Sequence, residues 1–285
     1  MPKIFHEMPL AMLINGDEYR LADGHYALVH LYDESADSGY YEYTVRQLKA
    51  GRDVILDNSV FELGQAFSAE RFAYWIEQLV KDAGYENVQK YLVYIIPDVL
   101  DNFEATIDSA RSFINQYSGL PGKRMVVVQG KTFEELLLCY RDLSYLPDIH
   151  RIGISFNCEA YNTIPEDQRN SSSYTTMLLH AWMAGRSAFI DYLVEEYGYQ
   201  LPVPLHMLGC SLPQEFKNYW NYTCIVSVDT SNPIVHGLHK IAYTENGLHE
   251  KLPMKLVDLM HKIPTAEEMS VIEHNCKLFR RFVNG

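Results

Sequence analysis

Three aspartates stand at the ends of apolar runs that are typical of buried strands. Asp57 and Asp229 each close such a run, and Asp98 follows another directly after Pro97. Carboxylates that lie close together shift one another's pKa values and can divide acid and base roles between them. A carboxylate can also attack a sugar carbon and form a covalent intermediate. The alternative is that each aspartate caps the turn behind its strand, a common use of this residue.

Two further polar residues accompany the carboxylates. Gln129 also ends an apolar run, although its side chain is too long for the turns that Asp and Asn stabilise. Its amide is suited to a two-point hydrogen bond with a planar ligand. His206 lies within another apolar run, where a buried core histidine with satisfied nitrogens is an equally good interpretation.

Strand-like runs alternate along the chain with longer helical patterns, which is typical of βα folds. The expected strands cover residues 26–32, 53–57, 91–97, 124–129, 151–156, 204–208 and 224–229. Residues 240–243 are a possible eighth strand, and residues 12–14 are a competing extra strand. We therefore predict one α/β domain over residues 1–285, a TIM-type (β/α)8 barrel. The carboxyl ends of barrel strands converge on one face, so the polar residues at those ends should meet.

Helical spacing and capping residues predict the elements between the strands. Ser68 is a good N-cap, and Thr132 with Glu135 matches a capping box. The expected helices cover residues 68–83, 101–117, 132–143, 172–197, 213–219 and 265–282. The polar segment 157–173 is an extended βα loop, which either carries function or is a tolerated surface insertion.

Composition limits the classes of protein to be considered. The chain has 285 residues, 47% of them hydrophobic, which is enough for a full core and argues against disorder. Its net charge of -13 disfavours a broad phosphate-binding surface. Five widely spaced cysteines predict neither a disulfide framework nor a zinc knuckle. We see no signal peptide or membrane span, so we expect a cytoplasmic protein, in the host cytoplasm if a phage encodes it.

The segments at the strand ends resemble the motifs of the tRNA-guanine transglycosylases and their DNA-acting relatives. That family is a TIM barrel that exchanges a guanine base for a 7-deazaguanine. Six segments match in order: Asp57-Asn-Ser-Val-Phe-Glu62, Pro97-Asp98, Val127-Val-Gln-Gly130, Arg151-Ile-Gly153, Leu208-Gly-Cys-Ser-Leu-Pro-Gln-Glu-Phe216 and Asp229-Thr-Ser-Asn-Pro233. Each match is weak alone, whereas six in order over residues 57–233 are more specific.

The resemblance implies a role for each carboxylate. Asp229 would attack the anomeric carbon and form a glycosyl intermediate, while Asp57 would move protons to and from the bases. Asp98 would accept hydrogen bonds from the N1–H and N2–H groups of guanine, and Gln129 and the Gly153 amide would address O6. The target nucleotide would have to be flipped out or single-stranded.

Other residues of the expected base site are assigned through the same motifs. Gly209 is expected to line the site, and Phe61 and Phe156 could sandwich the base, although core packing is the common use of phenylalanine. No cofactor or metal is implied. The nucleic acid would be DNA rather than tRNA, the small partner a 7-deazaguanine of the preQ0 type, and the oligomeric state stays open.

Departures from the family pattern favour its compact DNA-acting branch. The family's zinc site of three cysteines and a histidine has no counterpart, and Pro233-Ile-Val-His236 replaces its Pro-Thr-Arg. Two other functions remain open. One is a TIM-barrel glycoside or nucleoside hydrolase that uses two carboxylates, and the other is a non-catalytic barrel that binds a purine.

Overall fold

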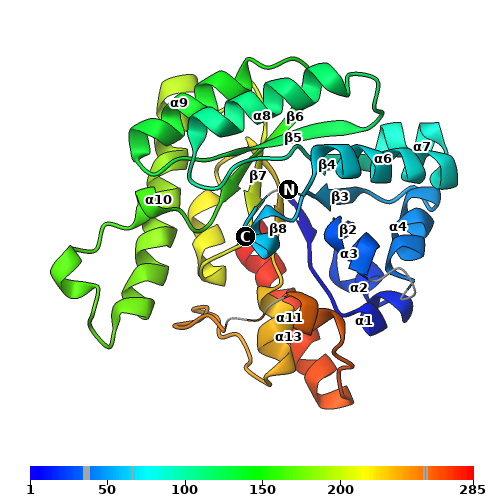
Figure 1. Ribbon diagram of the computed structural model, residues 1–285. Coiled ribbons are helices and arrows are strands. Elements are labelled where there is room, and N and C mark those ends of the chain that lie inside the picture. The colour runs from blue at the N-terminus through cyan, green and yellow to red at the C-terminus, as the bar shows by residue number, and fades with distance from the viewer. Residues whose placement is uncertain (35–38, 66, 253, 255) are drawn as a thin grey trace.

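The computed structural model describes residues 1–34, 39–65, 67–252, 254 and 256–285. Within these residues, eight parallel strands form one sheet that curls into a nearly closed barrel with helices around it (Figure 1). The strands are β1 (Lys3–Phe5), β2 (His25–Leu28), β3 (Val54–Asp57), β4 (Leu92–Ile95), β5 (Lys123–Val128), β6 (Ile149–Ser155), β7 (Leu205–Leu208) and β8 (Ile225–Asp229). The predicted single-domain TIM-type barrel is confirmed.

The eighth strand is not where the sequence placed it. The predicted strand 240–243 is irregular chain, and residues 12–14 belong to a helix instead. The missing strand is β1, which pairs with β8 in the register Phe5 with Asp229. Three residues are too short for a periodic signal, so β1 escaped prediction. Residues 30–32 also fall in a helix rather than in the strand predicted over 26–32.

The strand order runs from β1 through β8, β7, β6, β5, β4 and β3 to β2, so β1 and β2 are the edges of the sheet. Asp23 bridges these edges. Its backbone N–H donates to the Ile4 carbonyl at 2.8 Å, and its Oδ2 accepts from the Ile4 N–H at 2.8 Å. One residue therefore satisfies the edge groups of β1 that a ninth strand would otherwise pair.

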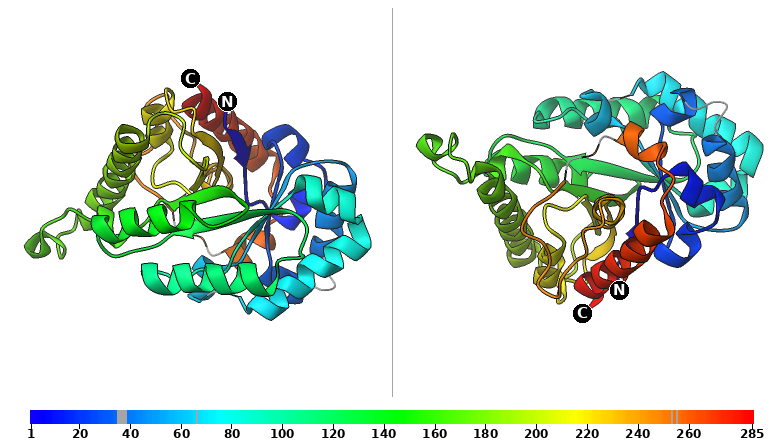
Figure 2. Two further views of the ribbon diagram at one scale, coloured as in Figure 1. Left: turned by 90° about the horizontal axis from the view of Figure 1, so that it is seen from above. Right: turned by 90° about the horizontal axis from the view of Figure 1, so that it is seen from below.

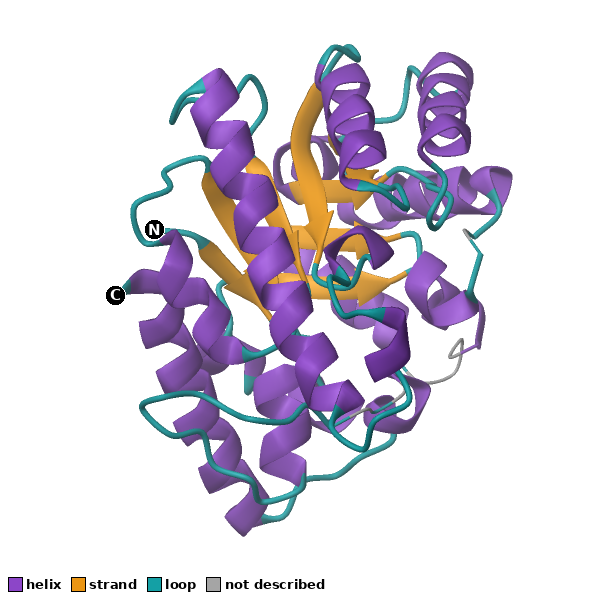
Figure 3. Cartoon of the chain, turned by 90° about the vertical axis from the view of Figure 1, so that its left-hand side faces the viewer, coloured by secondary structure: helices purple, strands orange, loops and turns teal. Residues whose placement is uncertain are grey.

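Helices surround the sheet, as Figures 2 and 3 show from three further directions. The longer helices are α4 (Tyr40–Lys49), α6 (Ala69–Ala83), α8 (Phe103–Gln116), α9 (Phe133–Ser144), α10 (Tyr174–Tyr197) and α13 (Ala266–Asn284). Short helices are α1 (Leu10–Ile14), α2 (Glu18–Leu21), α3 (His30–Glu34), α5 (Val60–Leu63), α7 (Tyr85–Tyr91), α11 (Asn232–Leu238) and α12 (Leu256–Met260). The 3₁₀ segments in the described part of the chain are η1 (Glu159–Tyr161), η2 (Glu166–Gln168) and η3 (Pro213–Tyr219).

Side-chain caps fix where several helices begin. The side chains of Ser68, Thr132 and Thr265 each accept a hydrogen bond from a backbone N–H of the first turn, as predicted for Ser68 and Thr132. The reciprocal half of the capping box forms only at Thr265, through Glu268, because Glu135 accepts from the Lys131 N–H instead. The predicted segment 157–173 joins β6 to α10 and projects away from the strands (Figures 1 and 2).

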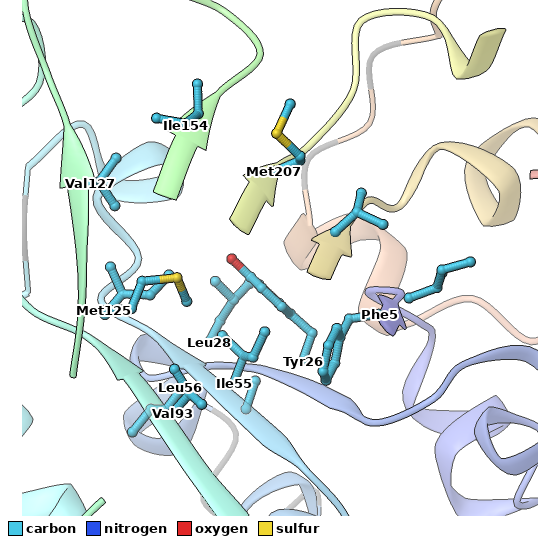
Figure 4. Packing of buried hydrophobic residues seen from close by; sticks show 14 of the residues in the cluster. Phe5, Tyr26, Leu28, Ile55, Leu56, Val93, Met125, Val127, Ile154 and Met207 are labelled. Atoms are coloured by element: carbon cyan, nitrogen blue, oxygen red, sulfur yellow. The ribbon is translucent and has the colours of Figure 1, made fainter. Parts of the chain in front are cut away.

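The barrel interior follows from the two-residue repeat of strands. Paired residues of neighbouring parallel strands share a face, so Phe5, Asp229, Ser227 and His206 all face inward. Figure 4 shows apolar side chains of different strands, among them Phe5 and Tyr26, reaching toward one another. Apolar side chains thus fill much of the barrel, a polar group of Arg151, Ser227 and His206 lies among them, and further polar residues gather at the carboxyl end. No helix in the described part of the chain is long and apolar enough to cross a membrane.

Candidate active site

Asp229 is the last residue of β8 and lies inside the barrel at its carboxyl end, only 3% exposed. Its Oδ1 atom accepts a hydrogen bond from His206 Nε2 at 2.8 Å and a longer one from the Gly209 N–H at 3.4 Å. Burial, reinforced by the negative charge of Asp57, raises the pKa of Asp229 to about 8. The two donors hold one oxygen and so fix the orientation of the carboxyl group.

A chain of hydrogen bonds inside the barrel determines which nitrogen of His206 carries the proton. Arg151 Nη1 donates to Ser227 Oγ at 3.0 Å, and Ser227 Oγ lies 2.7 Å from His206 Nδ1. Burial, with the nearby Arg151 and Arg186 charges, lowers the pKa of His206 well below its ordinary value, so the ring is neutral. Ser227 therefore donates to Nδ1, and Nε2–H donates to Asp229. His206 is both buried and satisfied, as its strand position allowed, and it also orients Asp229.

Glu7 is a carboxylate of the site that the sequence analysis missed. It follows β1 on the inward repeat of Lys3 and Phe5, and its carboxyl group and that of Asp229 influence each other's ionisation. Burial, followed by the charge of Asp229, raises the pKa of Glu7 well above its ordinary value. Two neighbouring carboxyl groups resist ionising together, because two adjacent negative charges would repel each other. Recognition of β1 as a strand would have identified Glu7 by its position.

Asp57 ends β3 on the same inner surface. Its Oδ2 accepts from the Tyr26 hydroxyl at 2.8 Å, and its Oδ1 accepts from the Ser59 N–H. Burial raises the pKa of Asp57, although these two hydrogen bonds oppose the shift. Ser59 has φ 64°, a left-handed conformation that costs a non-glycine residue about 1 kcal/mol or more. The family motif that this segment resembles has glycine at that place.

Asp98 lies beyond the end of β4 and is 2% exposed. Its two oxygens accept separate hydrogen bonds, from Asn58 Nδ2 at 2.7 Å and from Gln129 Nε2 at 2.6 Å. Burial raises the pKa of Asp98 to about 6, and both donors counteract the rise. Gln129 Oε1 accepts from the Asp101 backbone N–H at 3.2 Å. The structure thus brings Asp98 and Gln129 together as predicted, and it adds Asn58 as a missed partner.

The two predicted glycines occupy different positions. Gly153 is paired with both Val127 and His206 within the sheet, so it lies inside the barrel wall rather than at its rim. A Cβ atom there would lie 2.8 Å from Leu208 Cδ1. Gly209 has φ 60° and follows β7, where a Cβ atom would lie 2.6 Å from the Phe156 ring. The contact of the Gly209 N–H with Asp229 places Gly209 in the site. The missing side chain of Gly153, in contrast, leaves room for the side chain of Leu208.

The two predicted phenylalanines lie side by side. Their ring centroids are 6.3 Å apart with an interplanar angle of 59°, so the two rings lie tilted against each other. Phe61 is 59% exposed, whereas Phe156 also packs edge-on against Trp182 at 5.8 Å. Lys251 Nζ lies 3.4 Å from the Phe156 centroid and donates to the Cys210 carbonyl at 2.6 Å. Burial lowers the pKa of Lys251 to about 8.

A buried ion pair holds the loop that carries Gly209. Arg186, on α10, is fully buried and donates from Nε to Glu215 Oε1 at 2.6 Å. Its Nη atoms donate to the carbonyls of Ile154, Leu208 and Gly209 at 3.0–3.2 Å. Although burial alone would lower it, the Glu215 carboxylate raises the pKa of Arg186 above its ordinary value. Sequence reasoning missed this arginine because one cation in a helix is usually exposed.

Among the residues that the structure describes, no group of three or more His, Cys, Asp or Glu side chains is placed to hold a metal ion. His236, which follows the Asp229 loop, is buried and bonds the Asn232 carbonyl through Nδ1 at 2.9 Å. The Leu252 N–H donates to its Nε2 at 3.4 Å, so both ring nitrogens are satisfied within the protein. We therefore assign this histidine a structural role.

The site comprises carboxyl groups from three inward-facing strand ends, Glu7, Asp57 and Asp229, with Asp98 and Gln129 at one side. No protein-family model and no curated protein matches this chain. Asp229 is oriented by fixed donors, Glu7 and Asp229 affect each other's ionisation, and Asp98 accepts from an amide partner, which together suit nucleophilic attack and proton transfer.

Proposed function

We propose that this protein is a base-exchange transglycosylase that replaces guanine in nucleic acid with a 7-deazaguanine through a covalent intermediate on Asp229. The observation that carries the proposal is the orientation of that carboxyl group. His206 and Gly209 both donate to Oδ1, and among the residues that the structure describes no N–H group donates to Oδ2. An oxygen held in place at the mouth of a barrel is suited to attack the anomeric carbon of a bound nucleotide.

The exchange has two halves. In the first, an Asp229 oxygen forms a bond to C1′ while the C1′–N9 bond breaks and its electron pair leaves with guanine, which takes up a proton. In the second, the incoming base loses a proton and its nitrogen attacks C1′, which releases the carboxylate. A second carboxyl group must carry the proton in both halves, and the motif resemblance assigns that task to Asp57.

The Asp98 group supports recognition of a guanine-like base. An ionised carboxylate accepts from N1–H and N2–H₂ of guanine, and these two donors distinguish guanine from adenine. The amides of Asn58 and Gln129 hold the two Asp98 oxygens in one plane. Gln129 keeps a second N–H for O6, because only one of its amide hydrogens is used by Asp98.

DNA is the nucleic acid that we propose, and the base that enters is a 7-deazaguanine of the preQ0 type. A base inside this mouth must be flipped out of a duplex or come from a single strand. The exposed Phe61 ring, which faces Phe156, is placed to stack on such a base. With a net charge of -13, the protein would depend on local contacts of this kind rather than on a broad basic surface.

The experiment is incorporation of labelled guanine and labelled preQ0 into DNA and into tRNA, followed by denaturing electrophoresis to detect the covalent complex. Wild-type protein should label DNA and form the complex, and Asp229→Asn should do neither. Asp148→Asn is a matched control, because that aspartate side chain is 87% exposed and precedes β6 at the opposite end of the barrel.

Three results would contradict the proposal. Exchange by Asp229→Asn at the wild-type rate would exclude this aspartate as the nucleophile. Release of guanine without incorporation of a new base would identify a nucleoside hydrolase. Tight purine binding without any turnover would identify a non-catalytic binding barrel.

A further inference from the structure

Glu7 is placed beside the proposed nucleophile by the strand that the sequence did not reveal. Phe5 is the register partner of Asp229, and the Thr230 N–H donates to the Phe5 carbonyl at 3.2 Å. The chain then continues past Phe5 on the same inward repeat, so Glu7 reaches the carboxyl end of β8. The neighbouring His6 fixes this continuation, because its Nδ1 bonds the Thr230 carbonyl at 2.8 Å.

The hydrogen bonds of Glu7 differ from those of Asp57. The Glu7 carboxyl group interacts with the charge of Asp229, and within the described part of the chain its Oε2 atom is shielded from solvent and has no hydrogen-bond partner. Both oxygens of Asp57 already accept, from Tyr26 and from Ser59. A shielded oxygen without a partner is a costly feature for folding alone, which favours a role during the reaction.

We propose that Glu7, rather than Asp57, carries the proton that passes to the leaving base and returns from the incoming base. This inference rests on the proposed function and names the residue that performs its acid and base step. At the start, Glu7 is protonated and donates to the Asp229 carboxylate. In this scheme Asp57 accepts a hydrogen bond from Tyr26, and its negative charge raises the pKa values of Asp229 and Glu7.

The first half of the exchange makes Glu7 a stronger acid at the moment when the base needs a proton. When the Asp229 oxygen bonds to C1′, the carboxylate becomes a neutral ester and no longer stabilises the protonated form of Glu7. The Glu7 O–H bond breaks, its proton moves to the nitrogen of the departing guanine, and Glu7 becomes a carboxylate. Charge is conserved, because the negative charge of Asp229 has passed through the base to Glu7.

The second half reverses these steps. The Glu7 carboxylate takes the N–H proton of the incoming base, whose nitrogen forms a bond to C1′ as the ester bond to Asp229 breaks. The original pair, protonated Glu7 and ionised Asp229, is regenerated without an oxidant, reductant or metal. The charged and titratable groups that act on Glu7 besides Asp229 are Glu62, Asp57, Tyr26, Tyr40 and Lys251.

The test compares two leaving bases in single-turnover reactions. Guanine needs a proton to leave, whereas 7-methylguanine leaves a cationic nucleotide as a neutral base and needs none. Glu7→Gln, which matches the size of a protonated glutamate, should release guanine from DNA about 100-fold more slowly than wild type. The same variant should release 7-methylguanine at a rate within about threefold of wild type, because this base leaves without taking up a proton.

Asp57→Asn is the matched variant, and it should slow both leaving bases by a similar factor. Equal losses for both bases in Glu7→Gln would overturn the proposal, because they would show that Glu7 only supports the fold or Asp229. Wild-type guanine release by Glu7→Gln would overturn it as well and leave the proposed function intact, provided that Asp229→Asn is inactive. If wild-type protein exchanges no base, both proposals fail together.

Discussion

His206 Nε2 lies 2.8 Å from Asp229 Oδ1, and this contact is the last link of a chain that begins at Arg151. The donor and the acceptor of each hydrogen bond in this chain are fixed, because arginine only donates and a neutral histidine has one donor and one acceptor nitrogen. The positive charge at the start of the chain therefore polarises the N–H group that faces Asp229. The interior of the barrel, and not only its loops, thus sets the state of the proposed nucleophile.

Replacing His206 by phenylalanine should slow exchange about 10- to 100-fold, which corresponds to one lost hydrogen bond to a charged group. The lost donor favours the neutral form of Asp229, so the limb of the pH–rate profile that requires its carboxylate should move to higher pH. The profile of single-turnover guanine release is the measurement. Ser227→Ala, which removes only the next link, should shift the limb less. An unchanged profile in His206→Phe would contradict the role assigned to this ring.

Replacing Asp229 by asparagine should make the protein more stable at neutral and alkaline pH while abolishing activity. The folded state raises the pKa of Asp229 from 3.8 to about 8, so it binds this proton more tightly than the unfolded chain does. Wild-type stability therefore falls as pH rises between these two values, because the buried carboxylate must ionise. Asparagine has no such cost, so the variant should gain stability over wild type as pH rises toward 8, by an amount on the order of a few kcal/mol.

Urea unfolding of both proteins across this pH range measures the difference. The two curves should converge at low pH, where Asp229 is neutral in the folded and unfolded states alike. The control Asp148→Asn, whose exposed carboxylate lies 3.7 Å from Arg124 Nη1, should change stability by no more than about 1 kcal/mol at any pH. A variant that is less stable than wild type at pH 8 would show that the ionised Asp229 stabilises the fold.

Much of this site follows from one rule about strands, and the exceptions have a physical cause. Asp57, Gln129 and Asp229 were identified because they end continuous apolar runs that turn residues follow, a pattern that marks the ends of buried strands. Glu7 was missed because three residues of β1 show no repeat, and the barrel supplies the pairing that makes them a strand. Tertiary context, rather than local propensity, decides such short elements.

Arg186 shows a second limit of sequence reasoning. Its burial depends on Glu215, which is 29 residues away and lies in η3, so no local pattern connects the two. The Asn58 contact with Asp98 spans 40 residues for the same reason. The convergence of strand ends predicts which residues share a site, whereas it does not predict which polar groups pair within it.

Base affinity should depend on pH through Asp98. Only the ionised carboxylate accepts from guanine N1–H and N2–H₂, and burial raises the pKa of Asp98 to about 6 in the free protein. Affinity should therefore fall about tenfold for each pH unit below this value and level off above it. Asp98→Asn should bind guanine about 10- to 100-fold more weakly and without this pH dependence. Calorimetry with guanine from pH 5 to pH 8 provides the measurement; unchanged affinity in the variant would contradict the recognition role.

Replacing Arg186 by methionine should destabilise the fold by about 3–5 kcal/mol, because Glu215 would be left as an unpaired buried charge. The double variant Arg186→Met with Glu215→Gln should recover part of this loss. Recovery should be incomplete, because three backbone carbonyls also lose their donors. Urea unfolding of the two variants and of Glu215→Gln alone completes the cycle.

The same cycle should separate stability from activity. Arg186 holds the Gly209 carbonyl at 3.1 Å, and the N–H of that residue faces Asp229. The double variant should therefore remain slower than wild type in exchange even at temperatures where both proteins are fully folded. The double variant would lose activity because the Gly209 N–H is misplaced, while His206 still donates to Asp229. The limb of the pH–rate profile that reports Asp229 should therefore move less in the double variant than in His206→Phe. Wild-type exchange by the folded double variant would show that the buried pair serves stability alone.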